Sequence, residues 1–318
     1  MIPKIIHQTW KTSEVPLAWC YHVNTWKWQH PDWEYRFWND DDGLNFITEH
    51  FPDLIDKYTG FPYAIQRADL LRYALLYHYG GLYADIDYEC LRPFDDLIED
   101  RSILLGYEPE IHAHDLDRKH MVSNALMASS PQNDFFAQVL NEIKNDQTVV
   151  YAHVDVLETT GPLLLSKVCL HLKQHAPYIF PADVLSPVPN DSEYLNILVK
   201  NGPESIDLKL QLIQNGAYAI HYWSNSWVTN LAGNLINTEP EAIAGFTFIQ
   251  GMDSYGNDLF NGGRDIKEFG ERCLQDDRVV AFNTDGFAKS TLRDKQKWNS
   301  MKNAAWNEGL YVKKGIDF

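Results

Sequence analysis

Short apolar segments alternate with longer amphipathic ones at the start of the chain. Residues 2–7 form an apolar run typical of a buried strand, and residues 33–38 alternate as a second strand after a Trp-rich helix over 16–30. Two short helices are predicted at 44–51 and 52–58. The order strand, helix, strand is typical of the opening of a parallel sheet with helices packed on it.

The segment 63–79 is apolar on nearly every side, which predicts a buried helix rather than a surface one. Gly80 and Gly81 end this helix, and we expect one of them to adopt the left-handed conformation. A strand over 82–84 follows directly. A polar, acidic segment then begins at the end of this strand.

Further elements are predicted downstream. They are strands at 102–107, 122–128 and within 217–227, and helices at 131–144 and 163–174. The polar segment 112–120 has three histidines without metal-ligand spacing, so a solvated, mobile loop is expected, with a lid as the alternative.

A mixed segment rich in Asn, Gly, Pro and Glu spans 229–245 and is typical of a linker. Short alternating strands separated by turns follow it. We therefore predict two domains, an α/β domain over 1–235 and a small β-rich accessory module over 246–318 that binds carbohydrate or protein.

Charge and composition narrow the class of protein. The 318 residues carry a formal net charge of −17, which disfavours nucleic acid and anionic membrane as partners and leaves at most peripheral membrane contact. No apolar run approaches the roughly 20 residues that span a bilayer, and no signal peptide is recognised. The four cysteines lack C-x-x-C spacing. These features predict a cytoplasmic protein without a disulfide framework.

Asp85 and Asp87 follow the strand over 82–84, one residue apart. Residues i and i+2 of a strand point to the same side, so both carboxylates are expected to face one spot. Two such charges side by side favour a divalent cation, and hard oxygen ligands favour Mg²⁺ or Mn²⁺. The alternative is a solvated acidic turn.

Other residues could complete a site beside this pair. Gln8 and Trp10 lie at the carboxyl end of the first strand, where α/β sheets bind ligands, so Trp10 either stacks on a base or packs in the core. Asp69 and Arg72 share one face of the buried helix and either contact a ligand or form a structural ion pair.

Two later polar residues are also candidates. Asn124 interrupts an apolar strand and could contact a polyhydroxylated ligand. His221 ends the strand within 217–227 and is either a third metal ligand or a packing residue. Both lie far from Asp85 in the sequence.

The order of these motifs resembles the family 32 glycosyltransferases. Over roughly residues 1–230 the likeness rests on Trp10, on ADLLRYALLYHYGGLYADID, and on SNALMA, TTGP and HYWSNSW. A weaker likeness extends to the glucosylating bacterial toxins. In the last module, VVAFNTDGFAKSTL faintly resembles PAN or apple-type domains, although their disulfides are absent.

The resemblance implies an α/β fold of the GT-A type, a nucleotide-sugar-binding Rossmann-like domain. It implies Mn²⁺ or Mg²⁺ and a UDP-sugar or GDP-sugar donor. The implied metal ligands are Asp85, Asp87 and His221, and the implied catalytic residues are Asp69, Arg72 and Asp87. The implied donor-binding residues are Gln8, Trp10, Tyr83, Asn124, Ser226 and Trp227.

The resemblance further implies transfer of a hexose to a glycan, lipid-linked or protein acceptor, as in polysaccharide biosynthesis, with retention of configuration. No residue is an obvious covalent nucleophile, so a front-face reaction is expected, with Asp155 and Glu158 as alternative nucleophiles. The competing hypothesis is a non-catalytic sugar-binding or nucleotide-binding protein with the same fold.

Overall fold

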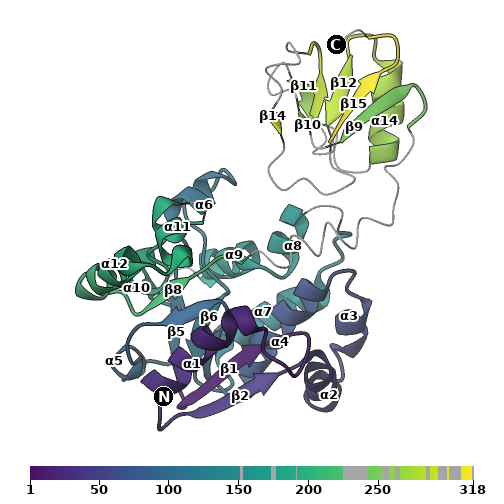
Figure 1. Cartoon of the computed structure of the whole chain (residues 1–318). Coiled ribbons are helices and arrows are strands. Elements are labelled where there is room, and N and C mark those ends of the chain that lie inside the picture. The colour runs from purple at the N-terminus through teal and green to yellow at the C-terminus, as the bar shows by residue number, and fades with distance from the viewer. Residues whose placement is uncertain are drawn as a thin grey trace. The chain divides into compact units, whose positions relative to one another are not determined.

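The chain forms two compact units, Met1–Ser224 and Asn225–Phe318 (Figure 1). The structure is a computed structural model that describes residues 1–150, 153–172, 177–190, 192–224, 243–250, 252–253, 258–261, 266–283, 287–292, 299–300 and 309–316. The predicted domain boundary between residues 235 and 246 falls largely outside the described residues and stays a prediction.

The first unit alternates strands and helices. Its strands are β1 (Ile5–Thr9), β2 (Glu34–Trp38), β3 (Gly81–Ala84), β4 (Tyr88–Cys90), β5 (Ile103–Gly106), β6 (Leu126–Ser129), β7 (Ile179–Phe180) and β8 (Ala219–His221). Its helices are α1 (Cys20–Gln29), α2 (Asp40–His50), α3 (Ile55–Gly60), α4 (Ala64–His78), α5 (Asp95–Ile98), α6 (Glu110–His114), α7 (Asp134–Asn145), α8 (His153–Thr159), α9 (Pro162–Leu172), α10 (Ala182–Leu185), α11 (Glu193–Lys200) and α12 (Pro203–Gln214), with a 3-10 turn η1 (Leu17–Trp19).

A six-stranded sheet of order β2-β1-β3-β6-β5-β7 forms the centre of this unit. Strand β1 runs parallel to β2 and β3, as predicted. The sheet is mixed rather than parallel throughout, because β6 runs antiparallel to both β3 and β5. Strands β4 and β8 form a separate antiparallel pair.

Alternate side chains of the central strands enter two different cores, as the two-residue period of a strand requires. One core receives Tyr83, Leu105 and Met127 and is covered by α2, α3, α4, α7 and α9. The other receives Leu82, Ala84, Leu104, Leu126 and Ala128 and is covered by α1, α5 and α10. The unit is therefore a three-layer α/β structure, which confirms the predicted fold class.

Gly80 and Gly81 connect α4 to β3 with φ angles of +67° and +94°. A Cβ at Gly80 would lie 2.7 Å from the Ser129 carbonyl oxygen, and one at Gly81 would lie 2.6 Å from that of Ile5. Both positions therefore require glycine. This tight connection lets β3 enter the sheet directly beside β1.

Several predicted elements differ in detail. The histidine-rich segment predicted as a loop begins with helix α6, and the segment before α9 forms a helix of its own, α8. The strand expected within 217–227 is confined to Ala219–His221. Helices α11 and α12 were not predicted.

The second unit is an antiparallel β-sheet module. Its elements are β9 (Phe246–Gln250), β10 (Met252–Asp253), β11 (Asp258–Asn261), α14 (Ile266–Gln275), β12 (Ala281–Asn283), β13 (Phe287–Lys289), β14 (Asn299–Ser300) and β15 (Gly309–Lys313). Five strands form a sheet of order β11-β13-β12-β15-β9. Phe282 is completely buried among Phe246, Phe269 and Tyr311. The β-rich module is thus confirmed, and α14 is an addition to it.

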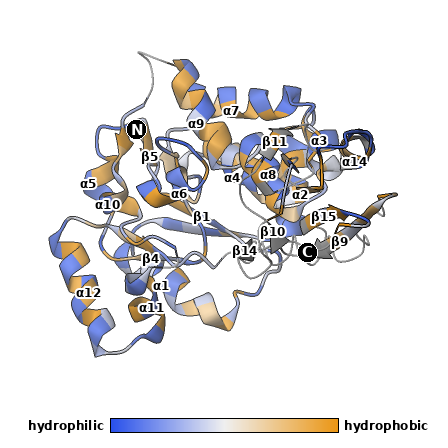
Figure 2. Cartoon of the chain, turned by 90° about the horizontal axis from the view of Figure 1, so that it is seen from above, coloured by the Kyte–Doolittle hydropathy of each residue, from blue (hydrophilic) through white to orange (hydrophobic). Residues whose placement is uncertain are grey.

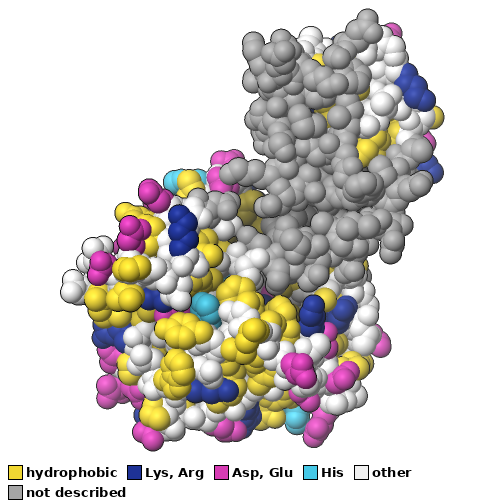
Figure 3. Space-filling view, viewed as in Figure 1, with side chains coloured by type: hydrophobic (Ala, Val, Ile, Leu, Met, Phe, Trp, Pro, Cys, Tyr) yellow, Lys and Arg dark blue, Asp and Glu magenta, His cyan; other side chains and the backbone are white. Residues whose placement is uncertain are grey.

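The helices and the surface show the mixture of apolar and charged residues that the composition contains. Helices α7 and α12 show alternating hydrophobic and hydrophilic residues, as expected for helices with one buried face (Figure 2). On the face in Figure 3, Lys and Arg lie in small groups among acidic and apolar side chains. No helix among the described residues is long and apolar enough to cross a membrane.

Candidate active site

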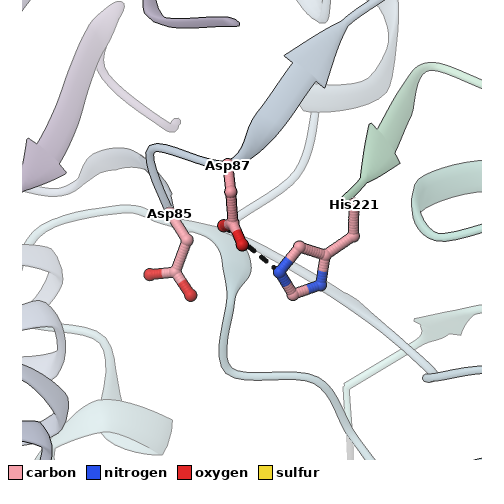
Figure 4. Close-up of side chains that lie close together, drawn as sticks. All are labelled: Asp85, Asp87 and His221. Carbon is pink, nitrogen blue, oxygen red and sulfur yellow. Dashed lines mark ion pairs between the residues drawn. The ribbon is translucent and has the colours of Figure 1, made fainter. Parts of the chain in front are cut away.

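Asp85, Asp87 and His221 converge between two short strands of the first unit (Figure 4). The two aspartates lie in the turn between β3 and β4, where the Tyr88 amide donates to the Asp85 carbonyl at 3.1 Å. The pair therefore lies in a turn, so the strand geometry from which a common direction of the two carboxylates was predicted does not apply to it. Pairing of β4 with β8 sets His221 opposite Tyr88 and brings it beside the pair.

This cluster has the chemistry of a metal site. One ligand atom from each of its three side chains lies within 4.8 Å of the others. His221 Nε2 is 3.3 Å from Asp87 Oδ1, while His221 Nδ1 is buried without a hydrogen-bond partner. Two carboxylates with one imidazole suit Mn²⁺ and are compatible with Mg²⁺. The residues present thus fit the implied metal.

Asp87 is the more buried carboxylate, with 8% of its side chain exposed. Its Oδ2 accepts a hydrogen bond from the Ser224 amide at 2.8 Å. Burial alone would raise the pKa of Asp87, but His221 and Ser224 outweigh it and hold that pKa below its usual range. Asp87 is therefore an ionised carboxylate with a fixed orientation.

Asp85 is more accessible, with 27% of its side chain exposed. Tyr83 donates to its Oδ1 at 2.6 Å, and Arg72 Nη2 lies 3.3 Å from the same oxygen. Burial raises the pKa of Asp85; Arg72 opposes this shift, and the charge of Asp87 adds to it. A cation between the two carboxylates would relieve that repulsion.

Asp69 and Arg72 form the buried ion pair that their spacing predicts, with Arg72 Nη2 3.4 Å from Asp69 Oδ1. The oxygens of Asp69 also accept from Asn124 Nδ2 and from the Thr160 hydroxyl, both at 2.9 Å. Burial raises the pKa of Asp69 to about 6, against the effect of Arg72. In this structure Asp69 and Asn124 hold Arg72, and Arg72 faces Asp85.

Three of the residues predicted to bind the donor, Gln8, Trp10 and Tyr83, differ in how exposed they are. Gln8 is buried, and its Nε2 donates to the Asp85 carbonyl at 3.3 Å. Tyr83 is also buried, with its hydroxyl between Thr9 and Asp85. Trp10 stays partly exposed beyond β1, with its amide bonded to the Trp38 carbonyl at 3.0 Å. Of these residues, Trp10 is the one with a partly exposed ring, over which Lys11 Nζ lies 5.6 Å from the centroid.

Two of the predicted donor contacts, Ser226 and Trp227, lie outside the described residues. Of the alternative nucleophiles, Asp155 is buried in α8, and Glu158 is an exposed partner of Arg118 at 3.6 Å. The amide of Ser224 was not predicted to contact the site. It acts through its backbone, which a residue pattern does not reveal.

Part of the sequence matches a known protein family. Residues 16–104 match the family described as the glycosyltransferase sugar-binding region containing the DXD motif. This range includes Asp69, Arg72, Asp85 and Asp87.

Two curated relatives are fungal enzymes. Inositol phosphoceramide mannosyltransferase 2 of Schizosaccharomyces pombe is 32% identical over 237 residues, which are 74% of this chain and 61% of that protein. Mannosyl phosphorylinositol ceramide synthase SUR1 of Saccharomyces cerevisiae is 35% identical over 175 residues, 55% of this chain and 43% of that protein. The chain thus spans about half of the length of these two relatives.

Among solved structures, the PaToxG glycosyltransferase aligns with a TM-score of 0.37 and 18% identity, covering 68% of this chain and 78% of that one. The sequence matches carry the assignment. As its sequence predicts, residues 16–104 of the chain match the glycosyltransferase sugar-binding region that contains the DXD motif, and the chain is similar to the two fungal mannosyl-transferring enzymes.

Proposed function

We propose that this chain transfers a hexose from a nucleoside-diphosphate sugar to a hydroxyl group, using Mn²⁺ or Mg²⁺ at Asp85, Asp87 and His221. The observation that carries the proposal is the convergence of these three side chains at the DXD motif. By likeness to the two fungal enzymes, mannose is the first sugar to test, with GDP-mannose as donor, and a lipid-linked inositol phosphate is the first acceptor.

In the proposed reaction the bond between the anomeric carbon and the diphosphate oxygen breaks, and a bond to the acceptor oxygen forms. The acceptor's proton leaves with the diphosphate. A divalent ion, when bound, supplies positive charge against the diphosphate. Asp85 and Asp87 bind that ion through oxygens whose orientation Tyr83 and Ser224 fix.

Arg72 supplies a permanent positive charge near the donor in this proposal. Burial opposes its charge, but Asp85 and Asp69 hold its pKa above the usual value. Its Nη1 donates to the Asn124 carbonyl at 2.8 Å, and its Nε is buried without a partner. We propose that Arg72 orients Asp85 and contacts the donor, and that Asp69 acts by positioning Arg72.

We propose retention of the anomeric configuration through a front-face reaction. What supports this is the placement of the alternative nucleophiles, since Asp155 is buried in a helix and Glu158 pairs with Arg118 at the surface. Nuclear magnetic resonance of the product formed from an α-linked donor tests this point. A β-linked product would contradict it.

The first experiment measures Mn²⁺-dependent release of nucleoside diphosphate from GDP-mannose and from UDP-hexoses, with and without acceptor. Asp87→Ala should remove nearly all turnover, at least about 100-fold, because it deletes a ligand and the partner of His221. Unchanged circular dichroism would show that the fold persists.

The matched control is Asp96→Ala, which removes an exposed carboxylate of α5 outside the cluster. It should keep wild-type turnover. Full activity of Asp87→Ala would overturn the proposed mechanism. Donor and metal binding by the wild type, without turnover on any donor, would instead favour the non-catalytic binding protein.

A further inference from the structure

Trp223 has a backbone conformation that is unusual for its type. Its φ angle is +49°. The other non-glycine residues with positive φ in the described part of the chain are polar, namely Asp100, Asp117, Gln132 and Asn201. A bulky residue in the left-handed region is a strained outlier, and such strain concentrates where the surrounding structure enforces it for function.

The strained residue lies directly beside the candidate metal cluster. Strand β8 ends at His221, and the Tyr222 amide still donates to the Asp87 carbonyl at 3.0 Å. Trp223 then adopts its left-handed backbone conformation, and the next amide, that of Ser224, donates to Asp87 Oδ2 at 2.8 Å. The conformation of Trp223 therefore sets the hydrogen bond from the Ser224 amide that orients Asp87.

The indole of Trp223 is held from several directions. Its Nε1–H donates to the Val188 carbonyl at 2.7 Å. Its ring centroid lies 3.9 Å from that of His221 and 4.5 Å from that of His112. The ring therefore packs directly against the imidazole that the metal site requires.

His112 is fixed in turn. Its Nδ1 lies 2.9 Å from Glu108 Oε2, and its Nε2 accepts from the Asn190 amide at 3.0 Å. An imidazole that accepts at Nε2 carries its proton at Nδ1 and donates it to Glu108. Helix α6 thus presents a rigid ring edge against the Trp223 indole.

We infer that Trp223 is a positioning residue for the metal site, which rests on the proposed function. Its left-handed backbone directs the Ser224 amide to Asp87, and its indole packs on the His221 ring. Tyr88 also stacks on His221, with the ring centroids 4.2 Å apart. In this inference Trp223 acts through Asp87 and His221 rather than on the donor or the metal. It makes Asp87 and His221 ready to bind a cation before the cation arrives.

The test uses the full chain and Mn²⁺ alone, with the free ion measured by electron paramagnetic resonance. Trp223→Val and Trp223→Asn both remove the indole, but Asn tolerates positive φ and Val does not. We expect both to weaken Mn²⁺ binding, and Val to raise the Kd about tenfold above Asn. Trp223→Phe, which keeps an aromatic ring beside His221, should have the smallest effect.

Trp19→Asn is the control, because Trp19 packs on the same cluster of apolar residues but does not contact the metal ligands. It should lower the Tm and leave the Mn²⁺ Kd unchanged. Equal Kd values for the Val and Asn variants, or an equal rise in Trp19→Asn, would overturn the inference.

Other outcomes are also decisive. If Trp223→Val does not fold, the comparison of Asn with Phe decides, since equal Kd values for both would overturn the inference. Wild-type protein that binds no Mn²⁺ overturns both this inference and the proposed metal site. Mn²⁺ binding that follows the expected series, without sugar transfer, supports the inference and overturns the proposed function alone.

Discussion

Asp85 and Asp87 have different surroundings although a single residue separates them. Asp85 is held by Tyr83 and Arg72 and remains partly exposed, whereas Asp87 is buried against His221 and the Ser224 amide. Each carboxylate is thus held in a fixed orientation by neighbouring protein groups. Fixed charged groups of this kind are what preorganised charge stabilisation needs.

Trp10 is the residue for which binding and packing give different expectations. If its partly exposed indole stacks on the base, Trp10→Ala should raise the donor KM about tenfold with little change in kcat, since such stacking contributes about 1–3 kcal/mol. Initial rates over a range of donor concentrations measure both constants.

The matched control for this prediction is Trp28→Ala, because Trp28 is a 63% exposed tryptophan on α1, away from the carboxyl end of β1. It should leave the donor KM unchanged. An unchanged KM in Trp10→Ala as well would assign Trp10 to packing.

At the scale of elements, His7 joins three parts of the sheet. His7 Nε2–H donates to the Gly80 carbonyl at 3.0 Å, and its Nδ1 accepts from Trp38 Nε1 at 3.1 Å. These bonds connect β1 to the α4–β3 connection and to β2. They require a neutral imidazole, because a proton at Nδ1 would oppose the Trp38 donor.

The neutral state of His7 predicts a pH dependence of stability. Burial lowers the pKa of His7 from 6.5 to about 4, so the unfolded chain binds a proton between these values that the folded chain does not. This contribution to stability is present above pH 6.5 and is lost as the pH falls toward 4. It amounts to up to about 3 kcal/mol at 1.36 kcal/mol per pKa unit.

Denaturant unfolding at pH 7 and pH 4.5 measures this effect. His7→Gln should be less stable at pH 7 and should lose less stability on acidification than the wild type. The exposed His114, changed to Gln, is the control and should keep the wild-type pH dependence. The same pH dependence in His7→Gln would show that His7 does not carry the effect.

At the scale of the whole molecule, each unit has its own core. Phe136 is completely buried in the first unit, and Phe282 in the second. The two units are compact by themselves. Separate cores favour separate unfolding transitions.

Scanning calorimetry of the full chain tests this independence. Replacing Phe282 by Ala removes about 3–5 kcal/mol from the second core and should shift one transition downward while the other stays in place. Phe136→Ala should shift the other one. A single transition that moves in both variants would contradict independent unfolding.

Much of the fold could be predicted because local patterns are strong in this chain. The segment 63–79, which is apolar on nearly every side, predicted α4. A left-handed conformation was predicted for one of the two glycines after it, and both adopt it. Helices α11 and α12 also carry local start signals, since Ser192 caps α11 and Pro203 opens α12. The antiparallel entry of β6 has no local signal, because strand direction depends on distant partners.

The sequence by itself determined the resemblance to DXD-containing glycosyltransferases, the α/β class and the pair Asp85 and Asp87, because these depend on residue types at short spacing. Tertiary structure alone decided how the pair is completed. Pairing of β4 with β8 brings His221 to the aspartates across more than 130 positions, and the backbone of Trp223 and Ser224 orients Asp87. Such contacts arise from the pairing of strands distant in sequence and from main-chain hydrogen bonds, which residue identities do not encode locally.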